Sequence, residues 1–284
     1  MRSLPDSFDK NAVAEIDSRL LKIMNDENVI IPLAIESGSR AWGFPSPDSD
    51  YDCRFVFVRP VENSFTLFSK RDVIETPLTP LIDVNGWELS KALKLLLSGN
   101  AVIVEWLTSP LVYHANLEFR ADFLKLAGEV CDRNDVSRHY FHLARNQFNR
   151  SVGEGKDIGL KKIFYSLRPL MALRWMRFHA DQRIAPMHFP TLCDEADLPA
   201  DLMRSIQSLM ALKAQTREMG TGVVPGVIME FLTSELELAA KWTAGKGKSD
   251  DESKKEKIDF FWRHWLSALH CDRNNIAKPS SSVG

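Results

Sequence analysis

The chain has 284 residues, enough for one large domain or two of ordinary size, and 44% of them are hydrophobic and 26% charged, as is typical of globular proteins. The formal net charge of −2 provides no overall attraction for nucleic acid or for an anionic membrane, although a local basic patch is compatible with it. The four cysteines lie far apart and form no C-x-x-C pair, which argues against a disulfide framework and a zinc knuckle and favours a reducing cytosol.

Neither a signal peptide nor a membrane span is predicted. The first 20 residues are polar and acidic and lack an apolar core, which a signal peptide would need. No apolar run approaches the roughly 18 residues that a membrane-spanning helix requires. We therefore expect a soluble, cytoplasmic protein that does not associate with a membrane.

Up to about residue 100, the apolar pattern predicts a mixture of helices and strands. The expected elements are a helix over 12–25, strands over 29–37 and 50–58, a short strand piece over 72–75, a strand over 81–85 and a helix over 87–98. Gly38 should end the first strand and Gly86 the last one, while Gly99-Asn100 should stop the second helix. This order indicates a mixed α/β unit.

After about residue 115, the pattern changes to helical spacing. Five segments carry it, at 117–130, 138–152, 158–180, 199–217 and 226–243. The charged stretch 245–257, GKGKSDDESKKEK, cannot bury apolar surface and predicts a flexible linker. An aromatic helix over 258–270 is expected to dock back on the body of the protein, and the serine-rich tail is expected to be disordered.

The fold class that these elements predict is α+β, with a small mixed-sheet domain followed by a helical domain. We expect the sheet domain over 1–115, the helical domain over 116–244, the flexible linker over 245–257, and a C-terminal helix and disordered tail over 258–284. The sequence shows no internal repeat.

Two aspartates separated by one tyrosine begin the second predicted strand. Because side chains alternate on a strand, Asp50 and Asp52 point to one face, with Cα atoms roughly 6.5–7 Å apart. At that spacing the carboxylates repel each other unless a cation lies between them. Mg²⁺ is the usual cation, held by one or two carboxylates together with substrate phosphates. Taken alone, the pair is better explained by two solvated aspartates at an exposed strand end.

A Gly-Ser turn, ten residues before this pair, changes the interpretation. Gly38 allows the backbone to approach a ligand closely, and Ser39 offers a hydroxyl and a backbone N–H, so the turn suits phosphate oxygens. A neighbouring strand should supply a third acid, and Asp83 lies between Ile82 and Val84 as such a residue would. An N-cap-like aspartate is the alternative for Asp83 alone. Together, the turn and the three acids describe a site for a nucleoside triphosphate.

This arrangement resembles the DNA polymerase β nucleotidyltransferase superfamily, and its fuller wording is closest to the predicted nucleotidyltransferases of the RNA-repair-pathway polymerase-β family. The segments that carry the resemblance are GSRAWGFPSPDSDYD, DVNGWELSKALKLLLSGN, VEWLTSP, KKIFYSLRPLMALRWM and APMHFPTL, and the likeness runs from residue 34 to about 192. The first string is the specific one. Cys53 departs from the pattern, because an aliphatic residue is expected after the two aspartates, but it faces away from them.

The resemblance implies a polymerase β-like nucleotidyltransferase that moves a nucleoside monophosphate from an NTP to a hydroxyl and releases pyrophosphate. It assigns catalysis and two Mg²⁺ ions, for which Mn²⁺ could substitute, to Asp50, Asp52 and Asp83, and the triphosphate to Gly38 and Ser39. Two ions about 3.5–4 Å apart can clamp both the attacking and the leaving oxygen. Arg40, beside the turn, could reach a phosphate, with a solvated arginine as the alternative.

One basic helix face is a further candidate for NTP binding. In KKIFYSLRPL, Lys161, Tyr165 and Arg168 fall on one side of a helix, and Lys162 could take the role of Lys161. Pro169 should end or kink the helix and could tilt this face towards the acids. Phosphate binding by the cations, with the tyrosine free to stack on a base, competes with an ordinary solvated basic stripe.

Several alternatives stay open. The acceptor could be an RNA 3′ end, a protein side chain or a small molecule, and the sequence does not indicate an oligomeric state. A catalytically inactive nucleotide-binding or antitoxin-like module is a second class, although all three acids are present. A helical-domain ribonuclease is a third, because Arg133-Asn134 and His139 fit a loose pattern of such enzymes.

Overall fold

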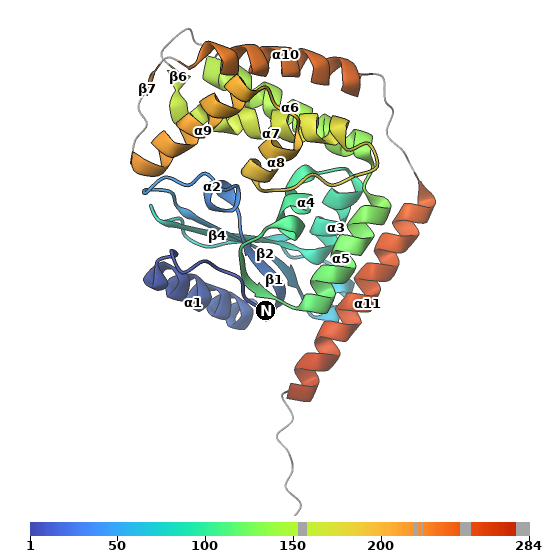
Figure 1. The fold of residues 1–284 in the computed structure, drawn as a ribbon. Helices are drawn as coiled ribbons and strands as arrows, with labels where there is room; N and C mark the ends of the chain where they lie inside the picture. The colour runs from blue at the N-terminus through green and yellow to red at the C-terminus, as the bar shows by residue number, and fades with distance from the viewer. Residues whose placement is uncertain (153–157, 218–220, 223, 245–250, 277–284) are drawn as a thin grey trace, which may run out of the picture.

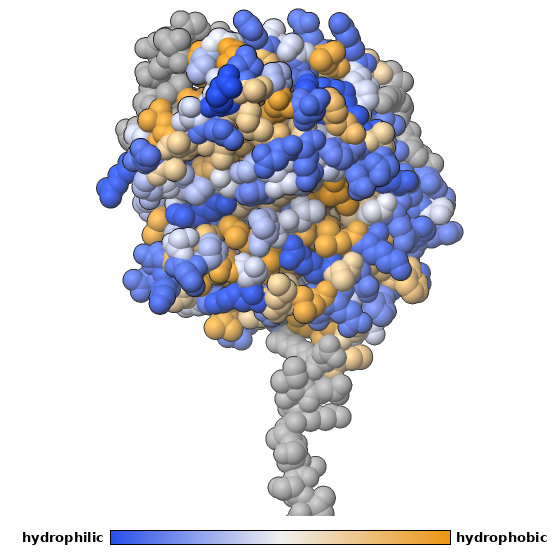
Figure 2. All heavy atoms as spheres, in the orientation of Figure 1, coloured by the Kyte–Doolittle hydropathy of each residue, from blue (hydrophilic) through white to orange (hydrophobic). Residues whose placement is uncertain are grey.

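We describe the fold from a computed structural model, which covers residues 1–152, 158–217, 221–222, 224–244 and 251–276 (Figure 1). The predicted α+β class is confirmed: one mixed five-stranded sheet lies among many helices. Within these ranges, none of the helices combines the length and the apolar character that crossing a membrane requires. On the face seen in Figure 2, hydrophilic residues predominate and apolar residues lie in small groups between them.

The sheet has the strand order β3-β4-β2-β1-β5. Its strands are β1 (Ile30–Glu36), β2 (Tyr51–Val58), β3 (Val73–Glu75), β4 (Ile82–Glu88) and β5 (Val112–Ala115), with a short 3-10 helix, η1 (Val61–Phe65), after β2. Strands β2 and β4 run parallel, and the other neighbouring pairs are antiparallel. The parallel pairing sets Asp52 directly opposite Asp83.

Strand β4 continues past Gly86 to Glu88, so the prediction that Gly86 ends it is wrong. The ring of Phe55 on β2 lies against this glycine, and a Cβ there would be 2.4 Å from the ring. Gly86 therefore makes room for Phe55 inside the strand instead of turning the chain. Helix α3 (Leu89–Leu97) begins after Glu88.

Helices cover both faces of the sheet (Figure 1). On one face, α1 (Lys10–Asp26) packs Ile16 and Leu20 against Phe55 and Phe57 of β2. On the other, α3, α4 (Ala101–Thr108) and α5 (Leu117–Val130) pack against alternate residues of the same strands. The sequence analysis missed α4 and β5, which are short apolar elements without a clear period.

The helical half contains the five helices expected there and adds one. The expected ones are α5, described above, with α6 (Arg133–Val152), α7 (Leu160–Phe178), α9 (Ala200–Gln215) and α10 (Gly226–Thr243), and α8 (Phe189–Glu195) is the addition. Strand β6 (Ile158–Gly159) pairs with β7 (Thr221–Gly222). Pro169 lies inside α7 and does not end it. Tertiary packing overrides the proline, because residues such as Leu167 and Leu170 are fully buried on either side of it.

One apolar core extends across both halves of the chain. It includes residues on one face of β1 and β2, residues of α3, α4 and α5, and residues of α7, α10 and α11 (Glu252–Ile276). The division of the chain into domains near residue 115 stays a prediction.

Helix α11 begins at Glu252, so the prediction of a flexible linker is wrong for residues 252–257. The charges of this segment meet opposite charges: Lys257 binds Glu129 of α5 at 2.7 Å, and Lys254 lies 3.8 Å from Asp132. Residues 245–250 and 277–284 lie outside the described part of the chain.

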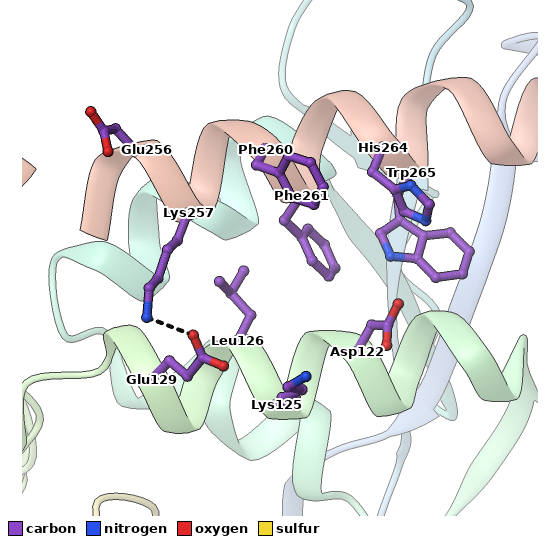
Figure 3. A pocket seen from close by; sticks show the side chains of 10 residues that line it. All are labelled: Asp122, Lys125, Leu126, Glu129, Glu256, Lys257, Phe260, Phe261, His264 and Trp265. Atoms are coloured by element: carbon purple, nitrogen blue, oxygen red, sulfur yellow. Dashed lines mark hydrogen bonds and ion pairs between the residues drawn. The ribbon is translucent and has the colours of Figure 1, made fainter. Parts of the chain in front are cut away.

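The expected docking of this last helix is confirmed. Figure 3 shows Phe261 and Trp265 of α11 pointing toward α5, with the Lys257–Glu129 ion pair at one end. Phe261 packs on Phe119 and Phe123 with ring centroids 6.0 and 5.0 Å apart. None of the predicted site residues lines the hollow between these two helices.

Candidate functional site

The three predicted acids lie at one end of the parallel strand pair. Asp52 on β2 and Asp83 on β4 are register partners and are half-buried, whereas Asp50 precedes β2 and is exposed. Burial raises the pKa of Asp52, the Arg54 guanidinium lowers it, and the negative charges of Asp50 and Asp83 raise it further. The acids therefore repel one another, as the sequence spacing predicts.

Arg54 holds two of these acids together, and the sequence analysis missed it. Its Nη2 donates to Asp52 Oδ1 at 2.8 Å and to Asp83 Oδ2 at 2.7 Å, while Nη1 donates to the Asp83 carbonyl at 3.1 Å. The signal was present in the sequence, because residues 50, 52 and 54 share one face of the strand. Arg54 therefore balances charge between Asp52 and Asp83, the two acids that it contacts.

Gly38 begins the short helix α2 (Gly38–Ala41) and lies against the Asp52 carboxylate. Its φ is +59°, a region that favours glycine, and a Cβ would lie 1.9 Å from Asp52 Oδ2. The Gly-Ser turn and the two aspartates, ten residues apart in sequence, are thus adjacent in space. Any larger residue at position 38 would displace the carboxylate.

The donor set fits a divalent metal, although it is not arranged as a finished metal centre. Among the described residues, no three His, Cys, Asp or Glu side chains are grouped closely enough to hold an ion. Asp52 and Asp83 nevertheless converge on one cationic group, and carboxylate oxygens are the ligands that Mg²⁺ and Mn²⁺ prefer. Asp52 and Asp83 would have to exchange Arg54 for such an ion, and its binding by Asp50, Asp52 and Asp83 stays a prediction.

A network of serines connects α2 to the loop before the acids. The Ser39 hydroxyl donates to Ser49 Oγ at 2.9 Å, and Ser49 Oγ also accepts the Ser46 N–H at 2.9 Å. Arg40 donates to the carbonyls of Ser49 and Asp50 and stacks on Tyr51, 3.9 Å from the ring centroid. The loop that carries Asp50 is therefore fixed from both ends. The roles of Ser39 and Arg40 in phosphate binding stay predictions.

Arg168 points into the core, and the prediction that it grips a phosphate is wrong. Its side chain is 2% exposed, and Nη1 donates to Glu105 Oε1 at 2.7 Å. Nε and Nη2 both donate to the Met187 carbonyl, and the guanidinium stacks on Trp42 at 4.8 Å. Tyr165 and Arg168 lie on one side of the helix, as their spacing predicts, but that side is buried in the core at Arg168. Glu105, which is 4% exposed, is the buried partner of this arginine.

The start of α7 lies nearer the acids. Tyr165 is half-buried and sits edge-on to Trp42, with ring centroids 5.9 Å apart. Burial raises its pKa, and the charges of Asp50 and Asp52 raise it further, so the phenol is within electrostatic reach of both. Lys162 is exposed, and the side chain of Lys161 lies outside the described part of the chain.

The helical half is anchored on the residues that follow the Gly-Ser turn. The Trp42 carbonyl accepts the Phe189 N–H at 2.8 Å, and Phe44 stacks on Phe164 of α7 with centroids 4.9 Å apart. Lys213 of α9, 1% exposed, donates to the Phe44 carbonyl at 2.5 Å. These contacts give the string SRAWGF two roles, because its first residues lie by the acids and its aromatic residues hold the second half.

The ribonuclease pattern gains no support from the arrangement. Arg133 and His139 both lie on α6, but a separation of six residues places them on different faces of a helix with 3.6 residues per turn. Arg133 stacks on Trp242 at 5.3 Å. Burial lowers the pKa of His139.

Replacing Arg54 should strengthen metal binding in the absence of nucleotide. Arg54→Gln removes the cation that competes for Asp52 and Asp83, so we expect Mn²⁺ affinity to rise about tenfold, which corresponds to losing charge-assisted hydrogen bonds of about 1.5 kcal/mol. Electron paramagnetic resonance of free Mn²⁺ measures this directly. Arg71→Gln, which removes an exposed ion pair with Glu75, is the matched control. Unchanged or weaker Mn²⁺ binding by Arg54→Gln would show that Arg54 supports the acids instead of competing with the metal.

Comparison with known proteins places the chain in a family. An uncharacterised protein, YcgL, of Bacillus subtilis (strain 168) is 37% identical over 222 residues, covering 78% of this chain and 84% of the relative. A solved nucleotidyltransferase-like protein from Exiguobacterium sibiricum 255-15 aligns over 96% of both chains at 10% identity, with a low TM-score of 0.29. Residues 13–264 match the RNA repair pathway DNA polymerase beta family, and the chain belongs to that family.

Proposed function

We propose that this protein is a Mg²⁺-dependent nucleotidyltransferase that moves a nucleoside monophosphate from an NTP to a hydroxyl group and releases pyrophosphate. The observation that carries the proposal is the register of β2 and β4, which sets Asp52 beside Asp83 while Gly38 lies against the Asp52 carboxylate. Membership of the RNA repair pathway DNA polymerase beta family supports it.

The acids are assigned to metal binding and proton transfer. Asp52 on β2 and Asp83 on β4 are register partners, and Asp50 immediately precedes β2. When two Mg²⁺ ions are bound there, they neutralise charge on the reacting phosphoryl group and lower the pKa of the acceptor hydroxyl. Asp83, on the neighbouring strand, is assigned to the acceptor side, where it would accept the proton of that hydroxyl or help to hold the second metal ion.

Binding of the NTP is assigned to α2 and to the start of α7. Gly38 and Ser39 are the first residues of α2, whose leading amides have no acceptor within the helix and suit phosphate oxygens. Tyr165 is assigned to stacking on the base, and the exposed Lys162 to neutralising a phosphate. An RNA end is the acceptor that the family description favours.

The test is transfer of label from each of the four α-³²P-labelled NTPs, with Mg²⁺ and total cellular RNA or protein as acceptors. Label appearing in RNA identifies both the donor base and the acceptor class. Label appearing in protein would support a nucleotidyltransferase whose acceptor is a protein and not RNA. Binding of NTP with no transfer to any acceptor would favour the catalytically inactive module instead.

Ser39→Ala should weaken NTP binding while leaving metal binding unchanged. Losing one hydroxyl contact to a charged phosphate corresponds to about 1.5 kcal/mol, or roughly tenfold in the dissociation constant at fixed Mg²⁺. Fluorescence titration with a labelled NTP measures the change. Ser49→Ala is the matched control, because it removes the same Ser39–Ser49 hydrogen bond but keeps the Ser39 hydroxyl. Equal losses in the two variants would show that Ser39 acts only by holding the loop.

A further inference from the structure

A buried carboxyl group lies on β1, the strand next to the one that carries Asp52. Glu36, the last residue of β1, is 0% exposed. Tyr113 of β5 donates its phenolic O–H to Glu36 Oε2 at 2.5 Å, and the backbone N–H of Asp52 donates to Oε1 at 3.0 Å. Burial raises the pKa of Glu36 to about 8, and the hydrogen bonds from Tyr113 and Asp52 oppose this shift. The proposed mechanism gives this group no role.

The way in which β1 ends explains why the Asp52 N–H needs a side-chain acceptor. Strands β1 and β2 pair up to the bond from the Ser37 N–H to the Asp52 carbonyl, at 2.8 Å. The chain then turns at Gly38, whose φ is +59°, and the Ser37 carbonyl, which the register would set opposite the Asp52 N–H, instead accepts the Ala41 N–H at 3.4 Å. The Glu36 carboxyl takes the place of that missing acceptor. A buried N–H without an acceptor would be free to change its orientation or to draw in water.

Packing alone does not account for a carboxyl group at this position. Burial and the negative charge of Asp52 disfavour ionisation of Glu36, and a leucine would fill similar space without either cost. What a leucine lacks is an oxygen that reaches the Asp52 amide. The Ser109 hydroxyl, which donates to the Glu36 carbonyl at 2.7 Å, fixes the backbone from which this oxygen projects.

We propose that Glu36 is a positioning residue that holds the backbone of Asp52, through its N–H, in the orientation in which the Asp52 side chain joins Asp50 and Asp83. Tyr113 donates to the other oxygen of the same carboxyl, so β5, the second neighbour of β1, also helps to hold the acids in position. This inference rests on the proposed function for its effect on catalysis, but not for its effect on the backbone.

The test compares Glu36→Leu, which removes the acceptor, with Glu36→Gln, whose carboxamide oxygen can still accept the Asp52 N–H. In Glu36→Leu we expect hydrogen exchange of the Asp52 amide, followed by NMR in the full chain, to be about tenfold faster, the effect of losing one hydrogen bond. Mn²⁺ affinity and kcat should fall by a similar factor, with the KM for NTP within about twofold of wild type. Glu36→Gln should recover most of each loss.

Val58→Ala is the control for general loosening, because Val58 is buried at the opposite end of β2 and touches none of the acids. It should lower stability without changing Asp52 exchange or Mn²⁺ affinity. Wild-type exchange and Mn²⁺ affinity in Glu36→Leu would overturn the proposal, as would equal losses in Glu36→Gln or in Val58→Ala. The exchange measurement needs neither metal nor NTP. Faster exchange in Glu36→Leu, with no label transfer by the wild-type protein, would reject the proposed function and keep the positioning role.

Discussion

Asp52→Asn and Asp50→Asn are each expected to abolish Mg²⁺-dependent transfer, with a loss of at least about 10²–10³-fold, the range seen when one preorganised charge-stabilising group is removed. Asparagine keeps the shape of the side chain but offers one neutral oxygen where a carboxylate offers two charged ones. At Asp52 the change should also relieve repulsion. Burial raises the pKa of this carboxyl, so its ionisation at neutral pH costs folding stability. We therefore expect Asp52→Asn to lose activity while its melting temperature stays level or rises.

Parallel melting curves and transfer assays check this expectation. Asp26→Asn is the matched control, since it removes the same charge from an exposed ion pair with Lys22 on α1. That variant should transfer label at the wild-type rate. Full activity in Asp50→Asn or Asp52→Asn would remove these residues from the metal site.

Arg168→Ala should lower the free energy of unfolding by about 3–5 kcal/mol, the usual cost of breaking a buried ion pair by removing one partner. Glu105, 4% exposed, would then be left as a buried carboxyl without its guanidinium, and the Met187 carbonyl would lose two hydrogen bonds. Urea denaturation measures the loss. The double variant Arg168→Met/Glu105→Gln should regain much of it, because neither side chain then carries a buried charge.

Arg174→Ala is the control for this prediction. Arg174 also binds a buried glutamate, Glu235, but Arg177 remains on that carboxylate after the substitution, so the loss should be smaller. A loss below about 1 kcal/mol for Arg168→Ala would contradict the structural role of Arg168 and reopen the question of what its side chain binds.

Local patterns in the sequence predicted the scaffold of the site well. The strand that carries Asp52 and the strand that carries Asp83 follow from β-branched runs, and the helices after residue 115 follow from their apolar spacing. The alternation expected for a strand over 50–58 set Asp50 and Asp52 on one face, but β2 begins at Tyr51, so only Asp52 lies on it. The same alternation includes Arg54, and its charge-balancing position could have been predicted from it.

Other features depend on contacts that no local pattern records. Helical spacing groups Arg168 with Tyr165, but only the packing of α7 on the sheet half determines which part of that face is buried. Gly86 looked like a strand end because its packing partner, Phe55, is 31 residues away in sequence. The position of Glu36 beside the acids could not be predicted for the same reason, since its hydrogen-bond partners lie on β2 and β5.

The aromatic anchors at Trp42 and Phe44 hold the helical half against the loop that precedes the acids. Moving the helical half away from the loop would separate the Phe44 ring from Phe164 and Phe189 and expose the ammonium of Lys213. Each buried ring that became exposed would cost about 1.5–3 kcal/mol, so wide opening during turnover is disfavoured. The helical half is therefore expected to keep its place beside the loop that precedes the acids throughout turnover.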